Sequence, residues 1–379
     1  MRTRAAVLVA DDRPRPYASS APIELHELEL APPGPGELLV RVDAAGVCHS
    51  DLSVVDGNRP RPVPMVLGHE AAGTVLARGA GVVDVREGAR VVLVFVPRCG
   101  VCRPCSRGRP ALCEPAAAAN AAGELLRGGR RWARLGNEVV HHHLGVSAFA
   151  EHVVVDRGSV VVVGDDVPAE VAALFGCALL TGAGAVINTA RVRPGDAVAV
   201  FGLGGVGLAA VLGAVVAGAE PIVAVDPVAQ RRELALELGA SAAIDAGSQA
   251  GSVAEQVREL TAGGVDHAFE AVGSAAVLAE AWAATRRGGT TVAIGLPHPT
   301  ARFEVPAVQL VGEARTLVGS YLGDAVPAED LPRLVALWRT GRLPVDRLAS
   351  GTRRLDELNL ALDALAEGRG VRQVVLPHT

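Results

Sequence analysis

Four cysteines of this 379-residue chain stand close together in the segment CGVCRPCSRGRPALC, at Cys99, Cys102, Cys105 and Cys113. Thiolates separated by two, two and seven residues can surround one tetrahedral Zn²⁺. Disulfides are the alternative, but adjacent C-x-x-C pairs in a reducing compartment favour a metal. We therefore predict a closed structural zinc site at these four residues.

A glycine-rich turn carries a second chemical signal. Gly202, Gly204 and Gly207 fit G-x-G-x-x-G between an apolar run and an Ala/Val/Leu-rich helical run, and Asp226 follows at about the ~20-residue spacing of a dinucleotide-binding βαβ unit. Gly202 would permit the tight turn, Gly204 would leave room for a pyrophosphate, and Gly207 would let the helix lie close on the sheet. We predict that the helix N-terminus binds the phosphates.

Two simpler interpretations of this stretch compete with cofactor binding. Residues 197–219 carry no charge and are long enough for a membrane span. Six glycines within them, and strand-like runs on either side, argue against a span. A purely structural glycine turn would not require an acid at the position of Asp226.

The two remaining cysteines, Cys48 and Cys177, lie far apart in the sequence. Taken alone, each is most simply a small buried hydrophobic residue, and His69 is most simply a core histidine. Together with the dinucleotide fingerprint, the three suggest a second zinc. Three protein ligands leave one position open for a substrate, and Cys₂His is the set known from alcohol dehydrogenase.

The elements that must position these residues fall into two groups. Short strands joined by proline and glycine turns fill the first part of the chain and indicate a small β-barrel-like domain. From about residue 197 to 296, strand and helix signals alternate, which predicts a parallel sheet with helices on both faces. Residues 115–140 have weak periodicity and are expected to form a surface excursion. A helix is predicted to begin at Pro168, with Asp165 and Asp166 as capping candidates.

Composition excludes several other classes of protein. The formal charge is −5 and all 36 basic residues are arginine, so the chain has no overall electrostatic footprint for nucleic acid. The N-terminal apolar run is too short for a signal peptide, and we expect no membrane segment and a cytoplasmic location. The run His141-His142-His143 is expected to be loop sequence without a metal.

Motifs along essentially the whole chain resemble those of zinc-dependent medium-chain alcohol dehydrogenases of the liver and glutathione-formaldehyde type. They are GVCHSD, GHE, the four-cysteine segment, GCxxxTGxGA, GLGGVG, the acid at Asp226, FEAVG and RQVV. The resemblance implies a GroES-like catalytic domain of about 1–178 and 323–379, with a structural-zinc lobe at about 97–115. It also implies a Rossmann coenzyme-binding domain of about 179–322, and two zinc ions per chain.

The resemblance also implies roles for individual residues. Around the catalytic zinc it adds Asp51, which would orient His69, and Glu70 as a nearby or transient contact. The hydroxyl of Ser50 matches the group that takes the first proton from the alcohol. The liver-type relay then uses a histidine where this chain has Ser53, so the end of the relay stays open.

For the coenzyme, the resemblance implies NAD, with Asp226 binding the adenosine ribose and repelling a 2′-phosphate. Arg231 matches a family lysine that acts in the opposite sense, and His49 and Arg372 match residues at the pyrophosphate. The full set of implied coenzyme contacts is His49, Thr181, Gly202, Gly204, Gly205, Val206, Gly207, Asp226, Arg231, Val272, Leu296 and Arg372. Residues 306–322 match an edge strand through which family members pair, which implies a homodimer, with a tetramer left open.

The substrate is less constrained than the reaction. Phe95, Leu144 and Leu296 fall at apolar pocket positions of the family, whereas Arg59 and His143 fall at such positions and are polar. Either both polar residues point to solvent, or they bind an anionic group of the substrate. Open alternatives for the function are a polyol or amino-alcohol dehydrogenase of the same superfamily, and a zinc- and nicotinamide-binding sensor without turnover.

Overall fold

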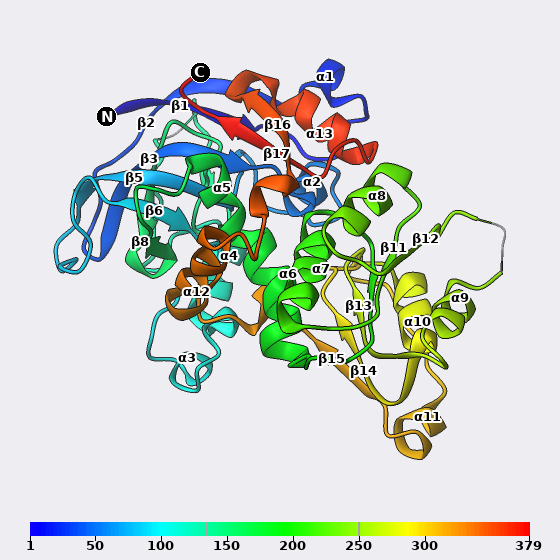
Figure 1. Ribbon diagram of the computed structural model, residues 1–379. Coiled ribbons are helices and arrows are strands. Elements are labelled where there is room, and N and C mark those ends of the chain that lie inside the picture. Colours follow the sequence, from blue (N-terminus) through cyan, green and yellow to red (C-terminus); the bar gives the residue numbers. More distant parts are fainter. Residues whose placement is uncertain (134, 249–250) are drawn as a thin grey trace. The chain divides into compact units, whose positions relative to one another are not determined.

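The computed structural model describes residues 1–133, 135–248 and 251–379 (Figure 1). The chain divides into two compact units. The first comprises Met1–Cys177, Val326–Pro332 and Ala349–Thr379, and the second comprises Ala178–Ala325 and Arg333–Leu348. The second unit is therefore inserted between the first and last parts of the other.

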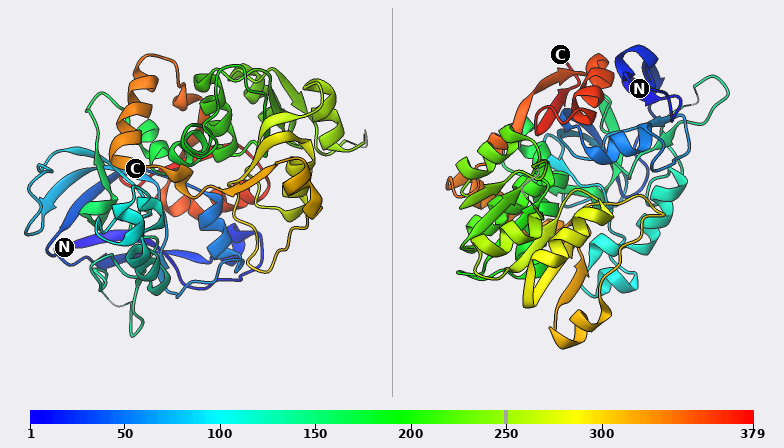
Figure 2. Two further views of the ribbon diagram at one scale, coloured as in Figure 1. Left: turned by 90° about the horizontal axis from the view of Figure 1, so that it is seen from below. Right: turned by 90° about the vertical axis from the view of Figure 1, so that its right-hand side faces the viewer.

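The first unit is built on two β-sheets and contains both chain termini (Figure 2). The smaller sheet has the order β2 (Ile23–Glu29), β1 (Arg2–Leu8), β4 (Met65–Val66) and β7 (His141–His142). The larger sheet has the order β16 (Ala349–Arg354), β17 (Arg372–Leu376), β3 (Glu37–Gly46), β5 (Ala71–Arg78), β6 (Arg90–Leu93) and β9 (Val160–Val162), and β8 (His152–Asp156) also pairs with β3. Most pairs are antiparallel, as short strands joined by turns require.

Short helices complete the first unit. They are α1 (Tyr17–Ser20), α2 (His49–Val55), α3 (Arg103–Ser106), α4 (Glu114–Ala122), α5 (Ala169–Leu174), α13 (Leu358–Ala366) and the 3₁₀ turns η1 (Pro110–Leu112), η2 (Arg157–Ser159) and η7 (Leu355–Glu357). Helix α12 (Pro327–Arg339) begins in this unit and ends in the second.

The second unit contains a six-stranded, fully parallel sheet. Its order is β12 (Ala242–Ile244), β11 (Ile222–Val225), β10 (Val198–Phe201), β13 (Val265–Glu270), β14 (Thr285–Ala293) and β15 (Thr316–Gly319). The helices and turns around it are α6 (Leu180–Gly184), α7 (Gly205–Ala217), α8 (Ala229–Glu237), α9 (Val253–Leu260), α10 (Ala275–Ala284), α11 (Ala307–Gly312), η5 (Leu322–Asp324) and η6 (Val345–Leu348). This order confirms the predicted doubly wound α/β architecture.

Helices cover both faces of this sheet (Figure 1). On one face, α9 and α10 pack against alternate residues of β10 and β11 in a single apolar cluster that includes Ala199, Phe201 and Val223. On the other face lies α7, which is apolar almost all round because it also packs against α6. The central strands β10 and β11 are entirely buried, which explains their continuous rather than alternating hydrophobic sequence.

The glycine turn between β10 and α7 has the conformation that its sequence requires. Gly202 has a φ of +88°, in the left-handed region that favours glycine. A Cβ on Gly207 would lie 1.7 Å from the carbonyl oxygen of Gly202, so this glycine allows the first helical turn to pack against the loop itself. A Cβ on Gly204 would meet nothing within 4 Å. The turn is therefore tight on its inner side and open on its outer side.

The long apolar stretch Ala169–Ala190 is a core helix. Its length and hydropathy would suffice for a membrane crossing, but 83% of its most apolar window is buried inside the protein. It is not a regular α-helix, because α5 continues into the π-helical segment η3 (Phe175–Leu179), then into α6 and a second π-helical segment, η4 (Ala185–Ala190). The uncharged stretch 197–219 is likewise no single span, since it divides into β10 and α7.

Three local predictions need correction. Residues 115–140 are not simply an irregular excursion, because α4 occupies their first third and ends at Gly123 in a left-handed conformation. Helix α5 is preceded by Pro168 without a side-chain cap, so neither Asp165 nor Asp166 caps it. Residues 306–322 are only partly strand: α11 comes first, and β15 then forms the edge of the parallel sheet.

The glycine turn yields a matched pair of variants. Gly207→Ala should lower the free energy of unfolding by about 1–3 kcal/mol, because the new methyl group overlaps a backbone carbonyl. Gly204→Ala should leave it within about 0.5 kcal/mol, because its methyl group enters open space. Thermal or urea denaturation followed by circular dichroism measures both, and equal destabilisation would contradict this description of the turn.

Candidate functional site

Helix α2 begins at a residue predicted to bind zinc. Cys48 is its N-cap, and Asp51, at the third helical position, accepts a hydrogen bond from the Cys48 backbone N–H at 3.1 Å. An acidic side chain here satisfies an otherwise unpaired N–H at the helix start. The spacing in CHSD therefore fixes the backbone from which the Cys48 thiol projects.

Asp51 also reaches the second predicted ligand. Its Oδ1 accepts hydrogen bonds from the Gly68 N–H at 3.2 Å and from His69 Nδ1 at 3.0 Å, and its side chain is fully buried. Gly68 is needed at that point because its φ is +88° and a Cβ would lie 2.7 Å from the backbone nitrogen of Phe149. Since Nδ1 of His69 is held by Asp51, Nε2 is the nitrogen left for a metal.

The third predicted ligand, Cys177, comes from the π-helical segment η3. Such segments are rare and frequently occur at functional sites. The ligand atoms of Cys48, His69 and Cys177 all lie within 4.8 Å of one another, and the three residues are buried. Two thiols and an imidazole at this spacing suit Zn²⁺. No fourth Cys, His, Asp or Glu of the described chain belongs to this group.

Electrostatics within the group favour a cation. The hydrogen bond with Cys177 lowers the pKa of Cys48 well below its usual value, with Arg372 and His69 acting in the same sense, and the same hydrogen bond raises the pKa of Cys177. Burial alone would lower the pKa of His69, but the charges of Asp51 and Cys48 raise it well above the usual value. Without a metal, ionisation of one thiol therefore disfavours ionisation of the other, and a divalent ion would let both ionise.

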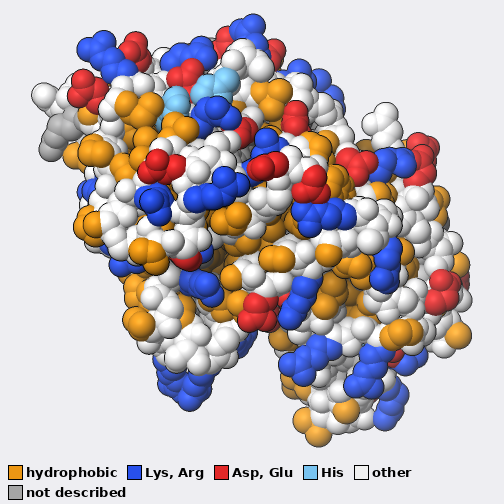
Figure 3. All heavy atoms as spheres, turned by 60° about the vertical axis from the view of Figure 1, so that its left-hand side comes forward, with side chains coloured by type: hydrophobic (Ala, Val, Ile, Leu, Met, Phe, Trp, Pro, Cys, Tyr) orange, Lys and Arg blue, Asp and Glu red, His pale blue; other side chains and the backbone are white. Residues whose placement is uncertain are grey.

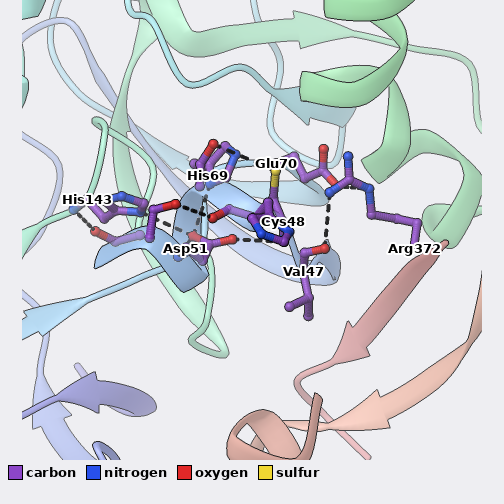
Figure 4. Close-up of polar contacts among 12 residues, drawn as sticks. Val47, Cys48, Asp51, His69, Glu70, His143 and Arg372 are labelled. Carbon is purple, nitrogen blue, oxygen red and sulfur yellow. Dashed lines mark hydrogen bonds and ion pairs between the residues drawn. The ribbon is translucent and has the colours of Figure 1, made fainter. Parts of the chain in front are cut away.

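A buried ion pair borders the group (Figure 4). Arg372 Nε lies 3.3 Å from Glu70 Oε1, and Arg372 also donates to the Val47 carbonyl at 3.1 Å. Burial raises the pKa of Glu70 to about 7, against the opposing effect of Arg372. The side chain of Arg372 is only 4% exposed and pairs with Glu70. Its predicted contact with a pyrophosphate stays a prediction.

His143 lies in this cluster rather than in solvent. It is 2% exposed, its ring makes an edge contact with the His69 ring at 5.6 Å between centroids, and its Nδ1 is 3.4 Å from Asp51 Oδ1. The interpretation that His143 points to solvent is therefore wrong. Burial lowers the pKa of His143 to about 3, which disfavours a positive charge on this ring.

The residues around His143 were not predicted from the sequence. Neighbouring His142 is also buried and neutral, accepts a hydrogen bond from the Arg131 N–H at 3.1 Å, and lies 3.3 Å from the hydroxyl of Ser147. That hydroxyl accepts the His143 N–H at 2.9 Å. The run of three histidines was the only sequence signal here, and a run of this type does not reveal which members are buried.

The other predicted pocket residues have mixed positions. The Phe95 ring packs on the His69 ring at 5.5 Å, and the Ser50 hydroxyl lies 3.9 Å from the Cys48 sulfur. Ser53 donates its hydroxyl hydrogen to the carbonyl of His49, one helical turn back. Leu144 and Arg59 are partly exposed. Ser50 and Phe95 thus lie beside the candidate ligands, while Ser53 is engaged with its own helix.

In the second unit, several residues predicted to contact the coenzyme have open space beside them, an unpaired polar atom or an exposed apolar side chain. The outer side of Gly204 is open, and the buried Oγ1 of Thr181 has no hydrogen-bond partner. Val272 and Leu296 expose about half of their apolar side chains, at 53% and 52%. A bound dinucleotide would account for these features. Gly205 and Val206 form the first turn of α7, and His49, in the first unit, is exposed.

Asp226 follows β11 at the carboxyl edge of the parallel sheet. Its carboxylate accepts hydrogen bonds from the Leu203 N–H at 2.7 Å and the Val228 N–H at 2.8 Å, and Arg231 lies 3.9 Å away. The acid is therefore fixed beside the glycine turn, as the fingerprint predicts, with an arginine close enough to offset part of its charge.

The fold of the four-cysteine segment brings the sulfur atoms of Cys99, Cys102, Cys105 and Cys113 together. The four Sγ atoms lie within 4.8 Å of one another, and all six cysteines of the chain are free thiols. Backbone N–H groups of Cys99 and Cys102 point to Cys113 and Cys99, each at 3.3 Å. This is a structural zinc cluster: four sulfur ligands close the coordination shell.

Comparison with known proteins identifies the family. The pattern described as "Alcohol dehydrogenase GroES-like domain" matches residues 34–166, and that described as "Zinc-binding dehydrogenase" matches residues 205–339. The chain belongs to the zinc-binding medium-chain alcohol dehydrogenases. The resemblance inferred from the sequence motifs is thereby confirmed, and so is the combination of a GroES-like domain with a Rossmann-like sheet.

Individual members of the family are similar over nearly the full length. The chain is 39% identical to geraniol dehydrogenase of Castellaniella defragrans over 94% of each chain, and 36% identical to an S-(hydroxymethyl)glutathione dehydrogenase of Escherichia coli over 99% of this chain and all of the other. Benzyl alcohol dehydrogenase of Acinetobacter calcoaceticus has a similar structure, with a TM-score of 0.92 and 33% identity over 99% of both chains.

The two cysteine sites should lose metal independently. The intact protein should contain two zinc ions per chain by plasma emission spectrometry. Cys177→Ala should retain one zinc and nearly all of the thermal stability, because its site is held by Asp51 and the surrounding core. Cys105→Ser should also retain one zinc but unfold at a lower temperature, because the lobe has little apolar core of its own. Retention of two zinc ions in either variant would contradict the assignment.

Proposed function

We propose that the protein catalyses reversible hydride transfer between an alcohol and NAD⁺, giving an aldehyde or ketone. The observation that carries this proposal is the buried convergence of Cys48, His69 and Cys177, with a ligand position left open. A zinc ion held there would polarise the alcohol oxygen, and a nicotinamide would accept the hydride. A sensor without turnover would not need an incomplete ligand set.

The chain's own residues would hold the substrate and its proton. Ser50, beside Cys48, is the hydroxyl that would receive the alcohol proton. Because the hydroxyl hydrogen of Ser53 is bound to the His49 carbonyl, we propose that water rather than Ser53 continues the proton path. Phe95 covers one side of His69 and would help to exclude water from the reacting carbon.

Asp226 supports NAD rather than NADP as the coenzyme. Its carboxylate is fixed by two backbone N–H groups and would accept hydrogen bonds from the ribose hydroxyls. At about 4 Å and an effective dielectric of 20, repulsion between unit charges is about 4 kcal/mol, roughly a thousandfold in affinity. Arg231, at 3.9 Å, offsets part of this repulsion.

The second unit presents a surface suited to pairing with a second copy of the chain. Strand β15 is the edge of the parallel sheet, and next to it in the sequence α11 exposes Val308 and Val311 at 73% and 87%. We propose a homodimer formed through β15. Figure 3 shows acidic side chains among basic ones over the upper half of the face that it presents, and the formal charge of the chain is −5. We propose a cytoplasmic enzyme without a nucleic-acid partner.

The test of this function is NADH formation from a panel of primary, secondary, aromatic and polyhydric alcohols, followed by absorbance. We expect turnover with several alcohols, and Ser50→Ala should reduce kcat by roughly 10²- to 10⁴-fold, the usual cost of losing a positioned proton acceptor. Ser50→Thr keeps the hydroxyl and should retain most of the activity. A zinc-replete protein that oxidises no alcohol would contradict the proposal.

Coenzyme choice provides a separate test. The wild-type kcat/KM should favour NAD⁺ over NADP⁺ by about 10²- to 10³-fold, and Asp226→Asn should reduce that ratio at least tenfold by removing the repelling charge. Arg231→Gln is the matched control and should increase the ratio. Equal kcat/KM values of the wild-type enzyme for the two coenzymes would show that Asp226 does not discriminate between them.

A further inference from the structure

The second unit has a hollow at the edge of its parallel sheet that lies opposite the glycine turn. Its volume is about 380 Å³. The lining comes from the end of α9 and the turn before β13, from the first residues of β14, and from α11 and the residues between it and β15. Because the strands are parallel, these segments meet at the amino edge of the sheet. Dinucleotides bind at the carboxyl edge of such sheets, so the hollow is separate from the predicted coenzyme contacts.

Arginine dominates the charge of this hollow. Among the described residues that line it, the one acid is Glu313, and Glu259 of α9 is not part of the lining. The chain as a whole has a formal charge of −5, so an excess of positive charge here is local. The four lining arginines are Arg258, Arg286, Arg287 and Arg315.

Arg315 forms a fixed wall of the hollow. It is 7% exposed, its guanidinium carbon lies 5.5 Å from the centre of the Trp282 ring, and it donates to the Trp282 carbonyl at 2.7 Å. It also pairs with Glu313 at 2.6 Å. Trp282 in turn donates its indole N–H to Gln309, another lining residue, at 2.7 Å. The acid of the lining is thus already engaged, and the wall is held by packing and hydrogen bonds.

Two of the other arginines keep positive charge that no carboxylate offsets. The side chain of Arg287 is joined within the described chain to the Gly312 carbonyl, a neutral partner, at 2.9 Å. No hydrogen bond or ion pair joins the exposed side chain of Arg258 to any described residue. Arg286, by contrast, pairs with Asp266. A guanidinium has five N–H donors, so Arg258 and Arg287 have donors available for a ligand.

The lining is best suited to a compact anion with more than one charged group. Arginine binds phosphate and carboxylate oxygens through paired N–H groups, and the two available guanidiniums come from different elements, α9 and β14. A hollow of about 380 Å³ is large enough for a small organic ligand. No aromatic side chain is among its described lining residues, so none would stack on a nucleotide base.

We propose that this hollow is a second ligand site, which binds a compact polyanion bearing phosphate or carboxylate groups through Arg258 and Arg287. The proposal is independent of alcohol oxidation, because none of its residues belongs to the candidate zinc or coenzyme sites. Arg258 stands in the last turn of α9, where its charge would complement the helix dipole even without a ligand. The experiment therefore measures binding rather than stability.

The probe is pyrophosphate, titrated into the zinc-loaded protein and followed by isothermal titration calorimetry. Saturating ADP-ribose keeps the predicted coenzyme site occupied. We expect one pyrophosphate per chain, with a dissociation constant that increases about 3- to 10-fold in Arg258→Gln and in Arg287→Gln, the usual effect of losing one partly exposed charged donor. Arg2→Gln removes the same charge from an exposed arginine of the first unit and should leave the constant unchanged. Citrate in place of pyrophosphate shows whether carboxylates serve as well as phosphates.

Trp282 provides a readout confined to the hollow. The chain has three tryptophans, so its indole ¹⁵N–H signal can be assigned by comparison with Trp282→Phe. The signal should shift when pyrophosphate is added to the wild-type protein, through Gln309 and Arg315, and much less at the same concentration in Arg258→Gln.

Three results would overturn the proposal. The first is a pyrophosphate affinity no higher than that of chloride, and the second is equal affinity in the wild type, Arg258→Gln and Arg287→Gln. The third is binding that is lost as the protein dimerises, because a carboxylate of a second copy would then be the occupant of the hollow. Since none of these measurements involves an alcohol, each result leaves the proposed oxidation untouched.

Discussion

The buried carboxylate of Asp51 is the interaction on which the site depends. It joins the start of α2 to the segment before β5, because it accepts hydrogen bonds from Cys48, Gly68 and His69. Two ligands from different parts of the chain are thereby fixed to one side chain. Such a charge is costly to bury unless it is hydrogen-bonded, so each of these three partners helps to hold Asp51 in place.

The other buried charges around the candidate zinc ligands place a second constraint on the site. Two thiols, an imidazole and the Glu70–Arg372 pair are buried together, and a divalent cation would offset the charge of two ionised thiols. The open ligand position would then be the place where the reacting oxygen of an alcohol binds.

Much of this architecture could be predicted from residue type and spacing. The parallel sheet, the glycine turn and the four-cysteine cluster follow from local patterns with a clear physical cause. The group of Cys48, His69 and Cys177 has no local pattern and was predicted by matching distant residues to a known ligand set. Features that depend on tertiary packing could not be predicted. The burial of His143, the pairing of Arg372 with Glu70 and the π-helical turn that carries Cys177 arise only when distant segments meet. Helix α4 was missed because its Ala-rich sequence has almost no amphipathic pattern.

The most direct test of the central claim is a crystal structure of the zinc-loaded protein with anomalous scattering recorded at the zinc edge. The account predicts one peak bonded to the sulfur atoms of Cys48 and Cys177 at about 2.3 Å and to His69 Nε2 at about 2.0–2.1 Å, with a water or alcohol oxygen as the fourth ligand. A metal-free site, or a zinc whose four ligands are all protein side chains, would contradict it.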